Sequence, residues 1–229
     1  MGLFIMLMSM AGLIAANDLW RRAAARRRTE ELQAVAAALG WSFAPTQPLD
    51  AVPGLERFSP FREGRGPAIR NFMAGRRGDT RAAVFDFHYT TGHGKSSHRW
   101  RRTVLYLWSE RLALPAFSVW PEGVLDRIEA LFGAEDIDFP DRPRFSSACK
   151  LLGKDEAAVR ELFGPEVTAF FEENPELCAE GAGSDLFVWR APSLAEGAEV
   201  PGLAEGGAEL LDRLLARGGV AAGATPAGR

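Results

Sequence analysis

The chain has 229 residues, of which 47% are hydrophobic and 25% are charged, and its formal net charge is −3. This composition excludes a disordered or fibrous chain, and the length allows one large domain or two small packed ones with a real hydrophobic core. Two cysteines, neither in a CxxC pattern, exclude a disulfide-rich fold and give metal or redox chemistry little support. In a reducing cytoplasm, Cys149 and Cys178 are expected to be buried as small apolar residues.

The N-terminal segment predicts a single membrane anchor. Residues 2–16 carry no charge. The predicted anchor is 1–20, and a helix over residues 2–20 spans roughly 28 Å, close to the thickness of a hydrocarbon core. The basic collar that follows consists of Arg21, Arg22, Arg26, Arg27 and Arg28. Because no Lys or Arg precedes the apolar run, we expect a single-pass protein of the bacterial inner membrane, with its N-terminus outside and its soluble domain cytoplasmic. A cleaved signal peptide and a buried or interfacial helix are the alternatives.

A basic juxtamembrane helix over residues 21–40 is expected to continue the anchor and to end at Gly40. The soluble domain covers residues 41–217, either as one unit or as two packed halves, 41–133 and 134–217. The sequence of its first part predicts an irregular stretch and several short strands, and these strands are expected to form an antiparallel meander. The irregular stretch is 45–67, and the strands are 41–44, 69–73, 82–89, 100–108 and 117–120.

The second part of the domain alternates between helices and strands. The predicted elements are a helix over 121–133, a strand over 145–152, a helix capped by Asp155, a helix starting at Pro165, a hairpin of 177–180 with 186–189, and a helix over 202–217. The tail, residues 218–229, is too small and polar to bury a core and is predicted to be disordered. The fold class is therefore α+β: an N-terminal transmembrane helix, then an antiparallel β-meander followed by a β-α-α-β-β-α segment.

The charges are distributed unevenly along the chain. Residues 1–111 hold 17 Lys and Arg against 9 Asp and Glu, a net charge of +8, whereas residues 112–229 hold 10 against 21, a net charge of −11. The basic half lies nearest the anchor, so anionic lipid headgroups are a candidate partner. The preferred interpretation is that these charges only solvate strand faces. No nucleic-acid-binding pattern is present, and nucleic acid is not an expected partner.

A Gly-rich hairpin tip is the strongest candidate binding site. Gly94-Lys95-Ser96 resembles part of a P-loop, but Tyr89 stands where that motif needs a glycine, and a strand follows in place of a helix. Such a tip can bind an anion through its backbone N–H groups, but a plain turn is the preferred interpretation, because Gly and Ser are ordinary turn residues. The candidate residues for an anion or a lipid headgroup are Gly92, Gly94, Lys95, Arg99, Arg101 and Arg102.

The three histidines of the chain all lie in this hairpin. Asp86 and His88 share one face of a strand, and His98 begins the return strand, so Asp86, His88 and His98 form a weak alternative metal site. Solvated hairpin residues are the preferred interpretation. No nucleophile elbow or dinucleotide fingerprint is present, so nothing argues for an enzyme, and no cofactor is expected.

Several sequence strings resemble an uncharacterised bacterial family of hypothetical proteins with one N-terminal transmembrane helix and one soluble domain. The strings are FDFHYTTGHGK (85–95), LPAFSVWPE (114–122), DIDF (136–139) and RFSSACKLLGKDEAAVRELFGPEV (144–167). The resemblance covers roughly residues 40–217, and it departs at Phe87 and Cys149, where the family has tyrosines. It implies an anchored α+β domain and no known activity.

The leading hypothesis is a membrane-anchored, cytoplasm-facing binding or interaction domain that is not catalytic and has an unknown protein or lipid partner. A metal-dependent hydrolase-like enzyme that uses Asp86, His88 and His98 is one alternative. An accessory or assembly subunit of a membrane complex is the other.

Overall fold

The computed structural model describes residues 2–62, 64–122, 136–190 and 194–218, except the side chains of residues 2–15, 59, 60 and 95. The predicted helix over 121–133 and the predicted disordered tail therefore lie almost wholly outside the described residues.

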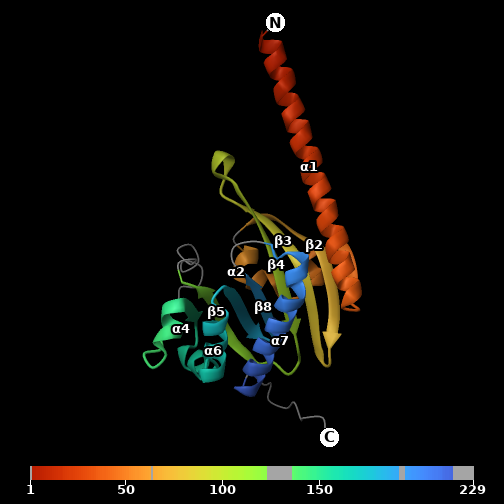
Figure 1. Cartoon of the computed structure of the whole chain (residues 1–229). Helices are drawn as coiled ribbons and strands as arrows, with labels where there is room; N and C mark the ends of the chain where they lie inside the picture. The colour runs from red at the N-terminus through yellow and green to blue at the C-terminus, as the bar shows by residue number, and fades with distance from the viewer. Residues whose placement is uncertain (1, 63, 123–135, 191–193, 219–229) are drawn as a thin grey trace.

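A single antiparallel sheet of eight strands forms the centre of the domain (Figure 1). The strands are β1 (Ser42–Gln47), β2 (Arg65–Arg77), β3 (Thr80–Thr91), β4 (His98–Trp108), β5 (Leu114–Pro121), β6 (Cys149–Gly153), β7 (Leu177–Gly183) and β8 (Asp185–Arg190). Their order across the sheet is β1-β2-β3-β4-β8-β7-β5-β6. Strands β1 to β4 form the predicted meander, but β5 does not continue it, because β8 pairs with β4 and places β5 beyond β7. The sheet is thus continuous across the division between 41–133 and 134–217.

Helices cover both faces of this sheet. The α-helices are α1 (Gly2–Ala38), α2 (Ser59–Arg62), α4 (Pro143–Ala148), α5 (Glu156–Leu162), α6 (Pro165–Glu173) and α7 (Val200–Ala216). The 3₁₀ turns are η1 (Leu49–Ala51), η2 (Leu55–Arg57), η3 (Gly94–Ser96) and η4 (Gly197–Glu199). One hydrophobic cluster joins the C-terminal end of α1 and helices α4 to α7 to the first face, and a second joins the η1–α2 segment to the other face.

Local sequence signals place several elements correctly. The Asp155 side chain accepts a hydrogen bond from the Ala158 backbone N–H and caps α5, and Pro165 is the first residue of α6. Cys149 and Cys178 are buried free thiols, as predicted. Burial raises the pKa of Cys149 to about 12, so its reactive thiolate is scarce at neutral pH.

Two predictions of local structure are wrong. Residues 145–148 continue helix α4 instead of starting a strand, because Pro143 begins that helix and Phe145 is buried against Phe139 and Phe163. The irregular stretch 45–67 holds η1, η2 and α2, whose apolar side chains cover the second face of the sheet. Short turns with apolar side chains therefore cover this face of the sheet, where a longer helix could otherwise pack.

Helix α1 is one uninterrupted helix of 37 residues, about 55 Å long at 1.5 Å per residue. The segment predicted as a helix over 21–40 thus continues the N-terminal helix as far as Ala38, and Gly40 follows its end with a φ of +67°. Among the residues that were searched, which exclude the side chains of 2–15, no helix is long and apolar enough to cross a membrane. Most of the predicted anchor lies outside those residues.

Candidate functional site: the α1 junction and the basic hairpin

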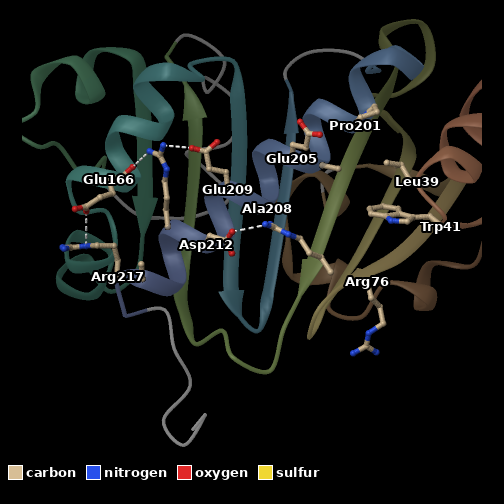
Figure 2. A pocket seen from close by; sticks show the side chains of 14 residues that line it. Leu39, Trp41, Arg76, Glu166, Pro201, Glu205, Ala208, Glu209, Asp212 and Arg217 are labelled. Atoms are coloured by element: carbon tan, nitrogen blue, oxygen red, sulfur yellow. Dashed lines mark hydrogen bonds and ion pairs between the residues drawn. The ribbon is translucent and has the colours of Figure 1, made fainter. Parts of the chain in front are cut away.

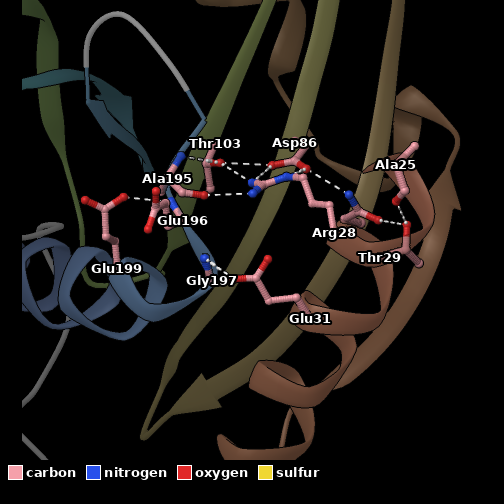
Figure 3. Close-up of polar contacts among 11 residues, drawn as sticks. Ala25, Arg28, Thr29, Glu31, Asp86, Thr103, Ala195, Glu196, Gly197 and Glu199 are labelled. Carbon is pink, nitrogen blue, oxygen red and sulfur yellow. Dashed lines mark hydrogen bonds and ion pairs between the residues drawn. The ribbon is translucent and has the colours of Figure 1, made fainter. Parts of the chain in front are cut away.

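A buried ion pair fixes α1 to the sheet (Figure 3). The Arg28 guanidinium donates from Nε to Asp86 Oδ2 over 2.7 Å and from Nη2 to Asp86 Oδ1 over 2.8 Å, so the pair is bidentate. The Asp86 residue is 1% exposed and the Arg28 side chain 18% exposed. Leu32 and Ala36, one and two turns further along α1, are buried on the same face of the sheet.

A bulge in β2 supplies a further donor to Asp86. Residues Asn71 and Phe72 interrupt the register between Arg70 and Met73, and Asn71 has a φ of +49°, a conformation that asparagine tolerates better than most residues. The Asn71 amide donates to Asp86 Oδ2 over 2.8 Å, and its Oδ1 accepts from the hydroxyl of Thr29 on α1. The bulge therefore connects the carboxylate to α1 a second time.

The same junction connects α1 to the segment that begins α7. Arg28 Nη1 donates to the carbonyl oxygen of Ala195 over 2.9 Å, and the Glu31 carboxylate accepts from the Gly197 backbone N–H over 2.8 Å. Thr103 on β4 accepts from the Ala195 N–H and donates to Asp86. Helix α1 is thus held by polar contacts to β2, β3, β4 and the approach to α7, and every strong acceptor in the cluster has a donor.

The structure divides the predicted basic collar into two parts. Arg28 is committed to the junction, whereas Arg21, Arg22, Arg26 and Arg27 are exposed on the free part of α1. Next to them, Leu19 is 67% exposed and Trp20 is 70% exposed. Large apolar side chains beside arginines on an exposed helix are typical of a membrane–water interface.

The β3–β4 register also divides the predicted anion-binding residues. Arg101 lies opposite His88 and Arg99 opposite Thr90, so both face the side of the sheet that carries α1. Arg102 lies opposite Phe87 on the other side and is only 7% exposed. We define the hairpin basic surface as four exposed residues that share the α1 side: Arg65, Arg70, Arg99 and Arg101.

The tip of the hairpin is a short 3₁₀ turn. Gly92 and Gly94 have φ values of +73° and +56°, and a Cβ on Gly92 would collide with the carbonyl oxygen of Ser96. The side chain of Lys95 lies outside the described residues. Figure 1 shows this tip projecting from the domain on the same side as the N-terminal half of α1, away from the C-terminus. The hairpin and the arginines of α1 therefore occupy the same end of the molecule.

The weak alternative metal set is not brought together. Asp86 and His88 face the α1 side, but His98 lies opposite Thr91 on the other side, where its ring contacts Trp100. The oxygens of Asp86 accept hydrogen bonds from Arg28, Asn71 and Thr103. Among the described residues, no group of three or more His, Cys, Asp or Glu side chains is placed to hold a metal ion.

His88 is expected to titrate below its ordinary pKa of 6.5, because burial disfavours its cation; Asp86 opposes the shift, and Arg70 and Arg101 add to it. Between the folded pKa and 6.5 the unfolded chain binds more protons, so this contribution to stability is lost as the pH falls through that window. An NMR titration of the imidazole should give a midpoint below 6.5, and His88→Gln should reduce the acid sensitivity of unfolding. A midpoint at or above 6.5 would contradict this assignment.

A hollow of about 990 Å³ runs along the outer side of α7 (Figure 2). Part of its charged lining is paired within the groove: Arg77 contacts Asp212 at 3.3 Å, and Arg217 contacts Glu166 at 3.9 Å. Trp41 and small residues of α7, such as Ala208, supply the apolar part. The groove offers contact area to another chain, but it holds no set of free, convergent polar groups of the kind that defines a catalytic site.

Sequence reasoning missed the junction as a site. It treated Arg28 as one of five collar arginines and Asp86 as a potential metal ligand. The available signal was the spacing of Arg28, Leu32 and Ala36 at i, i+4 and i+8, which places the arginine on the buried stripe of α1.

The fold and the junction define a class: one antiparallel sheet with helices on both faces, fixed to a long N-terminal helix. No protein-family model matches the sequence, and no curated protein matches it. Among solved structures, the chain is similar to the crystal structure of the mycobacterial trehalose monomycolate transport factor A, TtfA, with a TM-score of 0.61 and 13% sequence identity. The similarity covers 82% of this chain and 95% of that one, and it shows a shared fold.

Proposed function

We propose that the protein is a membrane-anchored, cytoplasm-facing interaction domain without catalytic activity, and that the hairpin basic surface binds anionic lipid headgroups. The observation that carries this proposal is the continuity of α1. A single helix joins the predicted anchor to the sheet, and its last turns are held by Arg28, Leu32 and Ala36. A domain fixed in this way has a constant orientation relative to the N-terminal segment.

The charges at that end of the molecule support the lipid partner. The exposed arginines and the exposed Trp20 are on α1, and the tip of the β3–β4 hairpin projects toward the same end of the molecule as the N-terminal half of that helix (Figure 1). Each arginine close to an anionic leaflet contributes about 1 kcal/mol, and the attraction extends about one Debye length, roughly 8–10 Å at physiological salt. A second point of contact beside the anchor would restrict the tilt of the domain.

We expect Arg99→Gln with Arg101→Gln to move the hairpin tip away from an anionic bilayer. The full chain, with a dye on a Ser96→Cys substitution, is reconstituted into nanodiscs that carry a lipid-borne quencher. Quenching should be greater with phosphatidylglycerol than with phosphatidylcholine alone, and it should fall with added salt and in the double variant. The buried native thiols Cys149 and Cys178 should leave the labelling selective.

The matched control is Arg76→Gln with Arg77→Gln, which removes the same charge from the other end of β3, where β2 and β3 are joined. In this variant the dye at position 96 should be quenched to the same extent as in the chain with Arg76 and Arg77 unchanged. Equal quenching in both lipids, or an equal loss in both double variants, would reject the lipid-binding part of the proposal.

An accessory role in a membrane complex is the second candidate, and the neighbouring fold of a protein described as a transport factor favours it. The groove along α7 is the surface we assign to a protein partner in that case. A photo-cross-linking residue at Ala208, compared with one at the exposed turn residue Asp79, should capture a discrete membrane-protein partner in cells. Equal products at both positions, or none, would reject the groove as that interface.

A further inference from the structure

A buried arginine on the second face of the sheet is surrounded by aromatic rings. The Arg102 guanidinium carbon lies 5.9 Å from the ring centre of Tyr89, 5.6 Å from that of Trp100 and 5.6 Å from that of Trp120. Trp120 is on β5, which β8 and β7 separate from β4, so the sheet curves enough for these side chains to meet across its face. We call Arg102 with Tyr89, Trp100 and Trp120 the Arg102 cage.

Two of the three guanidinium nitrogens have no acceptor within the described part of the chain. Its Nε and Nη1 atoms are inaccessible to solvent and make no hydrogen bond there, and no described carboxylate forms an ion pair with it. Rings that lie over a guanidinium attract its charge, but they do not accept hydrogen bonds from its in-plane N–H groups, which are costly to bury without an acceptor. The ring contacts alone therefore do not explain why an arginine occupies this position.

A second donor without an acceptor lies beside the cage. Trp189 is fully buried, its ring is 5.0 Å from that of Trp120, and its Nε1 makes no hydrogen bond among the described residues. Trp120 itself donates to Ser118, which donates onward to Glu180. Around the Trp120 ring, N–H donors on Arg102 and Trp189 thus remain available, while the local hydroxyl is already used.

We propose that the Arg102 cage binds a phosphate oxyanion, either a free phosphate compound or the phosphate of a lipid headgroup. Among the described residues Nε and Nη1 have no acceptor, so each can donate a hydrogen bond to a phosphate oxygen, and Trp189 is the further donor of the site. Because Nε and Nη1 are inaccessible to solvent, little water competes for these hydrogen bonds, which strengthens them. The site faces away from the hairpin basic surface, so it does not depend on the lipid contact proposed above.

Thermal unfolding of the full chain in detergent micelles tests this site with inorganic phosphate, glycerol phosphate and micellar phosphatidic acid as probes. We expect the Tm of the wild type to rise saturably with phosphate, because a ligand that binds only the folded state stabilises it. Arg102→Met should unfold at the same or a higher temperature than the wild type without phosphate, since it removes an unpaired charge. It should show no rise with phosphate.

Two further variants separate binding from folding. Arg102→Lys keeps the charge and loses the fork, so its affinity for phosphate should fall about tenfold or more. Arg142→Met is the matched control, because Arg142 also lies over a ring, that of Phe139, but donates to the Phe163 carbonyl oxygen over 2.7 Å. It should lower the Tm and leave the phosphate-dependent rise intact.

The probes distinguish the two sources of phosphate. A rise with inorganic phosphate and glycerol phosphate supports a soluble ligand, and a rise with phosphatidic acid alone supports a lipid headgroup. The proposal is overturned if no probe raises the Tm of the wild type, or if Arg102→Met responds like the wild type. A large loss of stability in Arg102→Met without phosphate would also overturn it, because that result would mean that the arginine is already satisfied.

Discussion

Replacing Asp86 by alanine is expected to lower the free energy of unfolding by about 3–5 kcal/mol, the usual cost of removing one partner of a buried ion pair. The substitution leaves the Arg28 guanidinium, which is mostly buried, without its bidentate acceptor, and it also removes the acceptor of Asn71 and Thr103. Urea-induced unfolding of the detergent-solubilised chain measures the loss, and hydrogen exchange should show faster exchange over residues 28–38.

The matched control for this prediction is Asp18→Ala. Asp18 contacts Arg22 over 2.7 Å, the same N–O distance as in the buried pair, but both side chains are exposed. Its removal should cost less than about 1 kcal/mol. Pairing Arg28→Met with Asp86→Leu should recover most of the lost stability, because neither charge is then left buried alone. Equal losses for Asp86→Ala and Asp18→Ala would show that burial does not strengthen the junction.

Replacing Asp185 by alanine is expected to cost about 1.5–3 kcal/mol. Its carboxylate accepts from Tyr106 Oη over 2.7 Å and from Arg57 Nη2 over 2.8 Å, which fixes η2 to the second face of the sheet. Burial, and then the bond to Asp185, raise the pKa of Tyr106 well above its ordinary value, so the phenol is the hydrogen-bond donor at neutral pH. Without Asp185 that buried hydroxyl has no acceptor.

A double-mutant cycle with Tyr106→Phe isolates this bond. Tyr106→Phe alone should cost about 0.5–1.5 kcal/mol, and adding it to Asp185→Ala should cost little more, because the unpaired hydroxyl is removed together with its partner. Chemical denaturation of the four proteins gives the coupling energy. Strictly additive losses would mean that the two side chains do not interact in the folded protein.

Local signals predicted the elements well where one residue decides the backbone. The cap at Asp155, the proline at the start of α6 and the glycine after α1 each act within one helical turn, so sequence alone locates them. The hairpins of β2 with β3 and of β7 with β8 were also predictable from alternating apolar residues around a glycine turn. An α+β fold follows from these elements.

The arrangement of the site depended on long-range pairing that sequence does not reveal. Adjacent arginines at 101 and 102 differ in role because strand side chains alternate, and the face that each occupies is set by its partner on β3. Likewise, the contact of Arg28 with Asp86 spans 58 residues, and the position of β5 depends on β8 entering the sheet beside β4. Periodicity identifies a strand but not its neighbour.

Because α1 is unbroken, the length of this helix also determines how the domain is rotated about the helix axis. Each residue of an α-helix turns the chain by about 100° and advances it by 1.5 Å. Any one-residue insertion between Trp20 and Arg28 would swing the whole domain by about a quarter turn about the helix axis, whereas seven inserted residues would return it to within about 20°. The direction in which the sheet faces is therefore encoded in the number of residues in that exposed segment, and not only in their charges.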